Sequence, residues 1–238
     1  MAKKSKEEWK TYGNVFDNHS RLLLHKLESQ GHFDEILGTV SIGKEANIFD
    51  GRKGNSKIII KIYRLENCDF NKMYDYIKYD PRYIGLRKHR RKIIFAWTQR
   101  EFRNLMIARE HITTPMPLIA KDNIILLEYI GNADMDNGEI ARKLKDDLPK
   151  DPDKFYKKTI LYMKKLYKEA ELVHGDLSEF NILNLNETPV FIDFSQSLPS
   201  NAPNADELLD RDIKNIARFF KKQGVDTSEE KILQYILK

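Results

Sequence analysis

The sequence has only one cysteine, Cys68, among its 238 residues. A single cysteine can form neither an internal disulfide nor a zinc site built from several thiolates, which fits a reducing compartment. No apolar run approaches the roughly 20 residues that a helix needs to cross a bilayer, and the first residues lack the apolar core of a signal peptide. We therefore expect a soluble, cytoplasmic protein.

Glycine-rich phosphate motifs are scarce as well. The Walker pattern is missing, and the loop 41–47, which could cover phosphates, contains one glycine, Gly43. Gly43 would let the backbone approach a nucleotide, and Ser41, Lys44 or backbone N–H groups could bind its oxygens. Taken alone, the loop is better explained as an ordinary hairpin turn, so support for a phosphate-binding role has to come from the rest of the chain.

Composition indicates a globular protein with a heavily solvated surface. Hydrophobic residues make up 41% of the chain, aromatic residues 11% and charged residues 32%. The length is sufficient for one large or two small lobes around a buried core. A net charge of +5 is a mild bias towards acidic partners such as nucleic acid.

Polar residues suited to phosphoryl chemistry gather in the stretch 172–183, between two short apolar runs. Asp176 and Asn181 lie five residues apart, and Asp193 follows at the end of an apolar strand. This is the protein-kinase layout: one Asp takes the proton of the acceptor hydroxyl, while the Asn and a second Asp hold magnesium on the phosphates. Alternatively, Asp176 and Asn181 only form a turn. The presence of Asp193 at the end of the following strand argues against this alternative.

Two positions depart from the usual kinase motifs. Gly175 stands where H-R-D has Arg, and Ser195 stands where D-F-G has Gly. These changes exclude an ordinary kinase that is switched by pairing Arg with a phosphorylated activation loop. No A-P-E follows, and the residues after Asp193 are too few for the usual substrate-binding helices. The platform for a peptide substrate is therefore expected to be missing.

Lys61 and Glu101 form the expected partner pair of the first lobe. Lys61 alternates with isoleucines in the predicted strand 57–63 and can point into a cleft, like the kinase Lys that bridges the nucleotide phosphates. Glu101 falls on the apolar stripe of a predicted helix, 93–109. A carboxylate on such a stripe needs a cation, and Lys61 is the obvious candidate. The alternative is a solvated Glu101 among neighbouring arginines.

Three motifs together closely resemble the Rio family of atypical protein kinases. They are Ser-Ile-Gly-Lys-Glu-Ala-Asn at 41–47, His-Gly-Asp-Leu-Ser-Glu-Phe-Asn-Ile-Leu at 174–183 and Ile-Asp-Phe-Ser-Gln-Ser at 192–197. The first and last look like the Rio1 subfamily. The resemblance implies a kinase-like fold, ATP with Mg²⁺ or Mn²⁺ as cofactors, and a hinge at which backbone groups of Glu128 and Ile130 bind adenine. It also implies a possible aspartyl phosphate on Asp193.

The remaining segments give weaker signals. The long stretch 66–92 interleaves arginines and lysines with tyrosines, so it can be an RNA contact or only a solvated face. It contains no Ser or Thr, which argues against autophosphorylation there. Apolar spacing predicts helices over 156–170 and about 212–222, with Asp212 as the N-cap of the second. Near the start, a short amphipathic helix that Gly31 can end is predicted from Val15, Leu22, Leu23, Leu24 and Leu27.

The sequence therefore predicts an α+β, two-lobed kinase-like fold with a truncated second lobe. One Rio-type domain covers 1–238: a helical extension (1–40), a first lobe (41–130) with a flexible basic loop (66–92), and a second lobe (131–238). The expected function is an atypical serine kinase or ATPase in maturation of the small ribosomal subunit. Its partners would be the pre-ribosomal particle and its RNA, with no membrane and no DNA. The alternatives are a small-molecule phosphotransferase and a catalytically weak RNA-binding scaffold.

Overall fold

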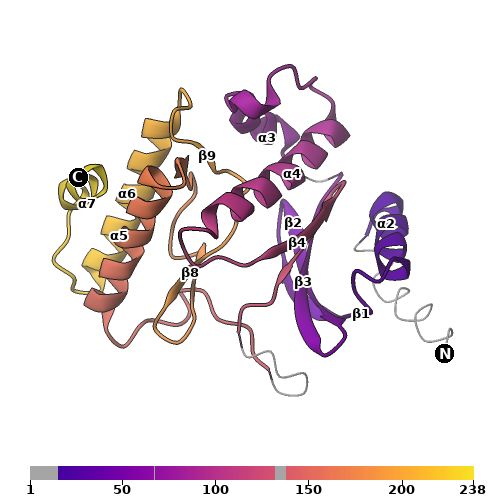
Figure 1. The fold of residues 1–238 in the computed structure, drawn as a ribbon, viewed down its shortest axis with the longest axis horizontal. Helices are drawn as coiled ribbons and strands as arrows, with labels where there is room; N and C mark the ends of the chain where they lie inside the picture. The colour runs from indigo at the N-terminus through magenta and orange to yellow at the C-terminus, as the bar shows by residue number, and fades with distance from the viewer. Residues whose placement is uncertain (1–15, 67, 132–137) are drawn as a thin grey trace.

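A computed structural model describes residues 16–66, 68–131 and 138–238. In chain order the elements are α2 (Asn18–Ser29), β1 (Glu35–Ile42), β2 (Ala46–Lys53), β3 (Ser56–Tyr63), α3 (Phe70–Ile77), a 3₁₀ helix (Pro81–Tyr83), α4 (Arg90–Ala108), β4 (Pro117–Lys121), β5 (Ile124–Glu128), α5 (Pro152–Lys168), β6 (Leu172–Val173), β7 (Ile182–Asn184), β8 (Pro189–Phe191), β9 (Leu198–Pro199), α6 (Ala205–Lys222) and α7 (Glu229–Leu237). The sheet with α2 to α4 forms one lobe, and α5 to α7 form the other (Figure 1). The predicted α+β, two-lobed architecture is confirmed.

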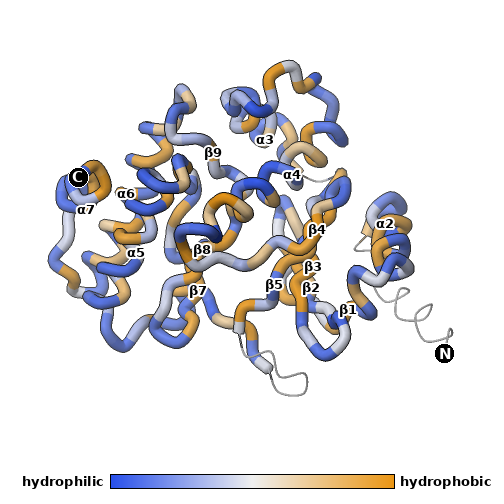
Figure 2. Tube along the Cα trace, in the orientation of Figure 1, coloured by the Kyte–Doolittle hydropathy of each residue, from blue (hydrophilic) through white to orange (hydrophobic). Residues whose placement is uncertain are grey.

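The first lobe is built on a five-stranded antiparallel sheet in the order β1-β2-β3-β5-β4. Strand β3 lies at its centre, and six consecutive residues, 58–63, are buried. A central strand with both faces covered is expected to be this continuously apolar. Figure 2 shows the hydrophobic colour concentrated along these central strands. Lys61 is the charged exception in the middle of the buried run.

Helix α2 covers one face of the sheet. Asp17 caps it by accepting the N–H of Ser20, and Gly31, at a φ of +73°, follows its end as predicted. Buried leucines of α2 pack with Phe33 against Phe49, Ile60 and other core residues of β2, β3 and β5. Leu22, expected on the apolar face, is instead 67% exposed. Val15, also expected there, lies outside the described residues.

Helix α4 covers the other face, and the segment before it is more ordered than the predicted loop. Residues 66–92 contain α3 and the 3₁₀ helix, and Met73 and Ile77 of α3 are buried in the main core. The buried Asp80 carboxylate accepts hydrogen bonds from Arg82 and from the buried Arg100 of α4. The segment expected to be a loop therefore contains a helix, α3, and its flexibility stays a prediction. The apolar residues of α3 recur at helical spacing, but the many charged residues of the segment made this pattern hard to recognise in the sequence.

The second lobe consists of α5, α6 and α7 with two small sheets, β6-β9 and β7-β8. Asp151 caps α5 and Pro152 begins it. Tyr156, Ile160 and Met163, which lie on the apolar face of the helix predicted over 156–170, are buried. Helix α6 begins at Ala205, which is earlier than predicted, and α7 was not anticipated. Among the described residues, none of the helices is long and apolar enough to span a membrane.

Candidate active site

Strand β3, helix α4 and the end of β8 bring three predicted site residues together. The Lys61 Nζ lies 2.7 Å from Glu101 Oε1 and 3.0 Å from Asp193 Oδ1. Lys61 is 5% exposed and Glu101 is 1% exposed. Ile60 and Ile62 face α2, so the alternation of a strand turns Lys61 towards α4. The predicted pairing of Lys61 with Glu101 is present.

Lys61 is the positive centre of this cluster, in which burial and the Asp193 carboxylate raise the pKa of Glu101. Burial alone would lower the pKa of Lys61, but Asp193 and Glu101 stabilise its ammonium and raise the pKa above its usual value. Burial would likewise raise the pKa of Asp193, yet the Lys61 ammonium and a hydrogen bond from Ser195 lower it to about 2. Lys61 is therefore a cation and Asp193 an anion at neutral pH. Tyr63 donates its hydroxyl to the second oxygen of Glu101.

Asp176 and Asn181 face each other in the loop after β6. The Asn181 Nδ2 donates to the Asp176 carbonyl at 2.8 Å and to its Oδ2 at 3.2 Å. These bonds point the Asn181 amide nitrogen at Asp176 and turn its oxygen away. Burial, followed by the negative charge of Asp193, raises the pKa of Asp176. The two carboxylates are thus close enough to interact, and they differ in their affinity for a proton.

Gly175 explains why this loop has no Arg before the Asp. Its φ is +80°, and a Cβ there would lie 2.9 Å from the Gln196 carbonyl oxygen. Asp212 accepts the N–H of Gly175 at 2.8 Å and the N–H of Leu177 at 2.7 Å. The predicted N-cap role of Asp212 is therefore wrong. It lies in the interior of α6, fully buried, and its carboxylate fixes the loop that carries Asp176.

His174 is a neutral residue that connects two segments of the site. It is 2% exposed, and burial lowers its pKa to about 4. Its Nε2 lies 3.1 Å from the Ile192 carbonyl, and its Nδ1 accepts the N–H of Asp176. The proton therefore belongs on Nε2. In this state His174 ties the strand before Asp193 to the backbone of Asp176.

The loop between β1 and β2 is shorter than predicted. The strands extend to Ile42 and from Ala46, so three residues connect them. Gly43 donates its N–H to the Ala46 carbonyl, and a Cβ at Gly43 would lie 2.7 Å from that oxygen. Only glycine fits this tight turn. Ser41 and Lys44 are exposed beside it, and their role in binding phosphates stays a prediction.

Glu128 and Ile130 lie where β5 ends and the chain enters the second lobe. The Glu128 N–H donates to the Met116 carbonyl, and the Ile130 carbonyl accepts the N–H of Ala141. The Glu128 N–H and the Ile130 carbonyl are therefore already engaged within the protein. The predicted hinge role of both residues remains a prediction.

Comparison with known proteins assigns the chain to a family. A family model described as the RIO domain matches residues 47–233. The chain belongs to the RIO family. The resemblance stated from its motifs is thereby confirmed, and it extends over most of the chain.

The RIO relatives are named as kinases. The chain is 43% identical to the RIO-type serine/threonine-protein kinase Rio1 of Methanocaldococcus jannaschii, covering 97% of this chain and 78% of that protein. It is 34% identical to the Rio1 kinase of Haloferax volcanii, covering 99% and 80%. This RIO protein is therefore an enzyme of the atypical kinase class, as predicted, and its relatives include the predicted Rio1 type.

Solved RIO structures share the fold. A crystal structure of the Rio2 kinase–ADP/Mg²⁺–phosphoaspartate complex from Chaetomium thermophilum superimposes with a TM-score of 0.65 at 24% identity. The alignment covers 89% of this chain and 64% of that chain. At this level of identity the likeness establishes the kinase-like fold.

The residues of this RIO chain fit a nucleotide-bound magnesium ion. Mg²⁺ is usually held by one or two carboxylates together with phosphates and water. Asp193 is ionised and its side chain is 40% exposed, while the Asn181 amide oxygen is directed away from Asp176. No cluster of three or more His, Cys, Asp or Glu residues that could hold a metal occurs in the described ranges. A site completed by phosphates therefore fits better than a cage made by protein alone.

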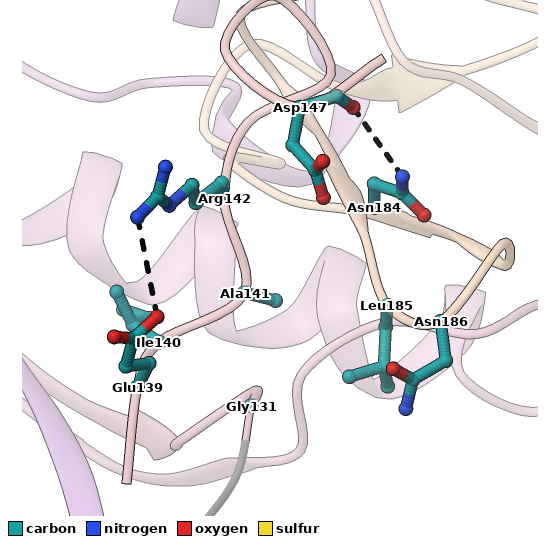
Figure 3. Close-up of a pocket in the computed structure, with 9 residues that line it drawn as sticks. All are labelled: Gly131, Glu139, Ile140, Ala141, Arg142, Asp147, Asn184, Leu185 and Asn186. Carbon is teal, nitrogen blue, oxygen red and sulfur yellow. Dashed lines mark hydrogen bonds and ion pairs between the residues drawn. The ribbon is translucent and has the colours of Figure 1, made fainter. Parts of the chain in front are cut away.

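A pocket of about 590 Å³ opens beside the predicted hinge (Figure 3). Gly131, Glu139 and Arg142 line one side, and Asp147 and Asn184 line the other, where the Asn184 amide donates to the Asp147 carbonyl. None of the predicted site residues lines it. The cluster around Lys61, rather than this hollow, carries the groups suited to phosphoryl chemistry.

Glu45 and Asp212 are site residues that sequence reasoning missed. Burial raises the pKa of Glu45, and the Asp193 carboxylate raises it further. Glu45, in the β1–β2 turn, is thus close enough to Asp193 for the two carboxylates to interact. The family motif at 41–47 contains it, and that motif was the available signal. For Asp212 the sequence offered no signal, because its partners lie at least 35 residues away.

Proposed function

We propose that the chain is an ATP- and magnesium-dependent atypical serine/threonine kinase or ATPase that acts in maturation of the small ribosomal subunit. The observation that supports the chemistry best is the Glu101–Lys61–Asp193 cluster facing Asp176 and Asn181. The serine/threonine activity is that of the named Rio1 relatives. The cytoplasmic location remains a prediction that belongs to this proposal.

Each residue has a distinct task in the proposed reaction. Lys61, fixed by Glu101, binds phosphate oxygens, and the Gly43 turn covers them. Asn181 and Asp193 would hold Mg²⁺, which neutralises phosphate charge when bound. Asp176 takes the proton of the attacking hydroxyl or water, and its raised pKa suits a base. Lys61, Glu101, Asp176, Asn181 and Asp193 are all present, which makes a catalytically weak scaffold the poorer explanation.

The ATPase branch of the proposal uses a covalent step at Asp193. Its Oδ1 is engaged by Lys61 and Ser195, so Oδ2 is the oxygen that attacks the γ-phosphorus. The bond from the γ-phosphorus to the β,γ-bridging oxygen breaks, and ADP leaves. Water then attacks the phosphorus of the acyl phosphate and Asp176 takes a proton from that water. The bond from phosphorus to Asp193 Oδ2 breaks, which releases phosphate and restores the Asp193 carboxylate. A phosphoaspartate is also named for the Rio2 structure of similar fold.

Lys61→Met tests the nucleotide part of the proposal. We expect turnover of ATP at saturating Mg²⁺ to fall about 10- to 100-fold, because an apolar chain of similar length no longer positions the phosphates. Steady-state phosphate release measures it. Lys53→Met, at the exposed end of β2, is the control and should keep wild-type turnover. Equal rates for Lys61→Met and wild type would contradict the assigned role.

A basic surface at the start of α4 supports the proposed ribosomal partner. We define this surface by the exposed residues Arg87, Lys88, Arg90, Arg91 and Lys92. No acidic residue occurs in the first turn of α4, and His89 provides no side-chain cap. Cations at a helix N-terminus oppose the helix dipole and cost roughly 0.3–1 kcal/mol each. The helix dipole therefore does not explain them. Lys88 and Arg90 also lie over the rings of Tyr74 and Phe70, and binding of a polyanion such as RNA is the role that we propose for the surface as a whole.

Removing three charges from the basic surface should weaken binding in a salt-dependent manner. For Arg87, Arg90 and Arg91 changed together to Ala, we expect lower affinity for single-stranded RNA and pre-ribosomal particles. The slope of log affinity against log salt should fall by about 2, at roughly 0.7 per lost phosphate contact. Fluorescence anisotropy across a salt series measures both quantities.

Helix α6 supplies a control with the same change of charge. Arg218, Lys221 and Lys222 are exposed there, and their triple Ala variant should keep the affinity and the slope. If both triple variants behave alike, the basic surface has no specific role in binding and only the net charge matters.

A further inference from the structure

Asn104 lies one helical turn after Glu101 on α4, so the two side chains share a face of the helix. The Asn104 side chain is completely buried. In sequence, Asn104 lies far from Asp193. Its Nδ2 donates to the Phe194 carbonyl at 3.0 Å and to the Ser197 carbonyl at 2.7 Å. Both hydrogens of the amide are thus used on one short segment of chain.

That segment is the turn immediately after Asp193. The Ser197 N–H donates to the Phe194 carbonyl and closes the turn, and Ser195 Oγ donates to Asp193 Oδ1 at 2.7 Å. Asp193 itself has a φ of +63°, which is unfavourable for a residue with a side chain. Such a conformation persists only where surrounding contacts enforce it. The two bonds from Asn104 are contacts of this kind.

Helix α4 therefore holds both sides of the Lys61–Asp193 pair. Glu101 fixes the ammonium of Lys61, and Asn104 fixes the backbone that presents the carboxylate of Asp193. Arg100 adds a longer bond from its guanidinium to the Gln196 carbonyl, at 3.4 Å. Because one rigid helix makes these contacts, the separation of the two charged groups is determined before any ligand arrives.

We propose that Asn104 is a positioning residue that sets the orientation of Asp193 for binding a metal–nucleotide complex. The inference rests on the proposed function, because it assumes that Asp193 contributes to the metal site. Asn104 touches neither nucleotide nor metal. Asn104 acts instead on the geometry of the Asp193 carboxylate, which would bind the metal.

The test compares the affinity of the full chain for ADP with and without Mg²⁺ by isothermal titration calorimetry. For Asn104→Ala we expect the gain in affinity that Mg²⁺ confers to fall at least tenfold, with metal-free ADP binding within about twofold of wild type. Asn104→Ser keeps one donor on a smaller side chain. Its gain in affinity from Mg²⁺ should lie between those of the wild type and of Asn104→Ala. It also provides a measurement if the Ala variant does not fold.

Asn123 provides the matched control. It is also completely buried, and its Nδ2 also donates twice, to Ser20 Oγ and to the Tyr63 carbonyl, both at 2.8 Å. Asn123→Ala should lower the melting temperature yet keep the Mg²⁺-dependent gain. If Asn104→Ala keeps the gain, or if both variants lose it alike, the positioning role is overturned. If the wild type shows no gain from Mg²⁺, the proposed function fails and this inference fails with it.

Discussion

Asp176→Ala is expected to slow turnover of ATP by roughly 10²- to 10⁴-fold, the range typical of a lost general base. The affinity for ATP should change little. A base acts on the attacking oxygen and so contributes mainly in the transition state. In the proposed function, binding of ATP depends instead on Lys61 and the metal site. The loop itself should survive the change, because Asp212 and His174 hold its backbone through bonds that do not involve the Asp176 side chain.

Single-turnover kinetics and calorimetric ATP titration measure the two effects separately. Asp210→Ala is the control, since Asp210 is an exposed carboxylate on α6 close to Asp212 in sequence. A loss of ATP affinity with unchanged turnover at saturation would contradict the role of a base. It would assign Asp176 to nucleotide binding instead.

The pH profile offers an independent check on the same residue. Burial and Asp193 raise the pKa of Asp176 above its ordinary value, and a base acts only when ionised. Turnover should therefore fall as pH decreases through that raised pKa, at a higher pH than an exposed Asp would give. Asp193, with a pKa of about 2, remains ionised throughout this window. The acidic limb of the profile should disappear in Asp176→Ala.

The central parts of this site could be predicted because short-range patterns encode them. Alternation in the strand 57–63 indicated that Lys61 points away from its isoleucine neighbours. The helical spacing around Glu101 placed a carboxylate on a buried stripe, where it needs a cation. Each of these features requires only a few consecutive residues. The structure accordingly contains both elements and the predicted contact.

The sequence was least informative about residues that act through a distant partner. Asp212 has a residue type that commonly begins a helix, and nothing near it reveals that Gly175 and Leu177 require a buried acceptor. Asn104 likewise looks like an unremarkable polar residue of a helix, because its partners lie 90 and 93 residues further along the chain. Such positions become interpretable only once the fold brings the segments together.

The formation of a phosphoenzyme at Asp193 is the second large expected effect. If the ATPase branch of the proposed function is correct, protein incubated with γ-labelled ATP and quenched during turnover should carry label on Asp193 that hydroxylamine removes. Hydroxylamine cleaves acyl phosphates and spares phosphoserine. Asp193→Ala should carry no such label and should be inactive. Inactivity alone does not discriminate, because a residue that only ligates metal predicts it as well.

Asp176→Ala makes the experiment decisive. Attack by Asp193 on the γ-phosphorus needs no base, since the attacking group is already an ionised carboxylate, as its pKa of about 2 indicates. Hydrolysis of the acyl phosphate does need one, because the attacking water must lose a proton. The Asp176→Ala variant should therefore accumulate hydroxylamine-labile label above the wild-type level while releasing phosphate more slowly. If neither protein carries such label while the wild type turns over ATP, the covalent step is wrong, and Asp193 keeps only its proposed role at the metal.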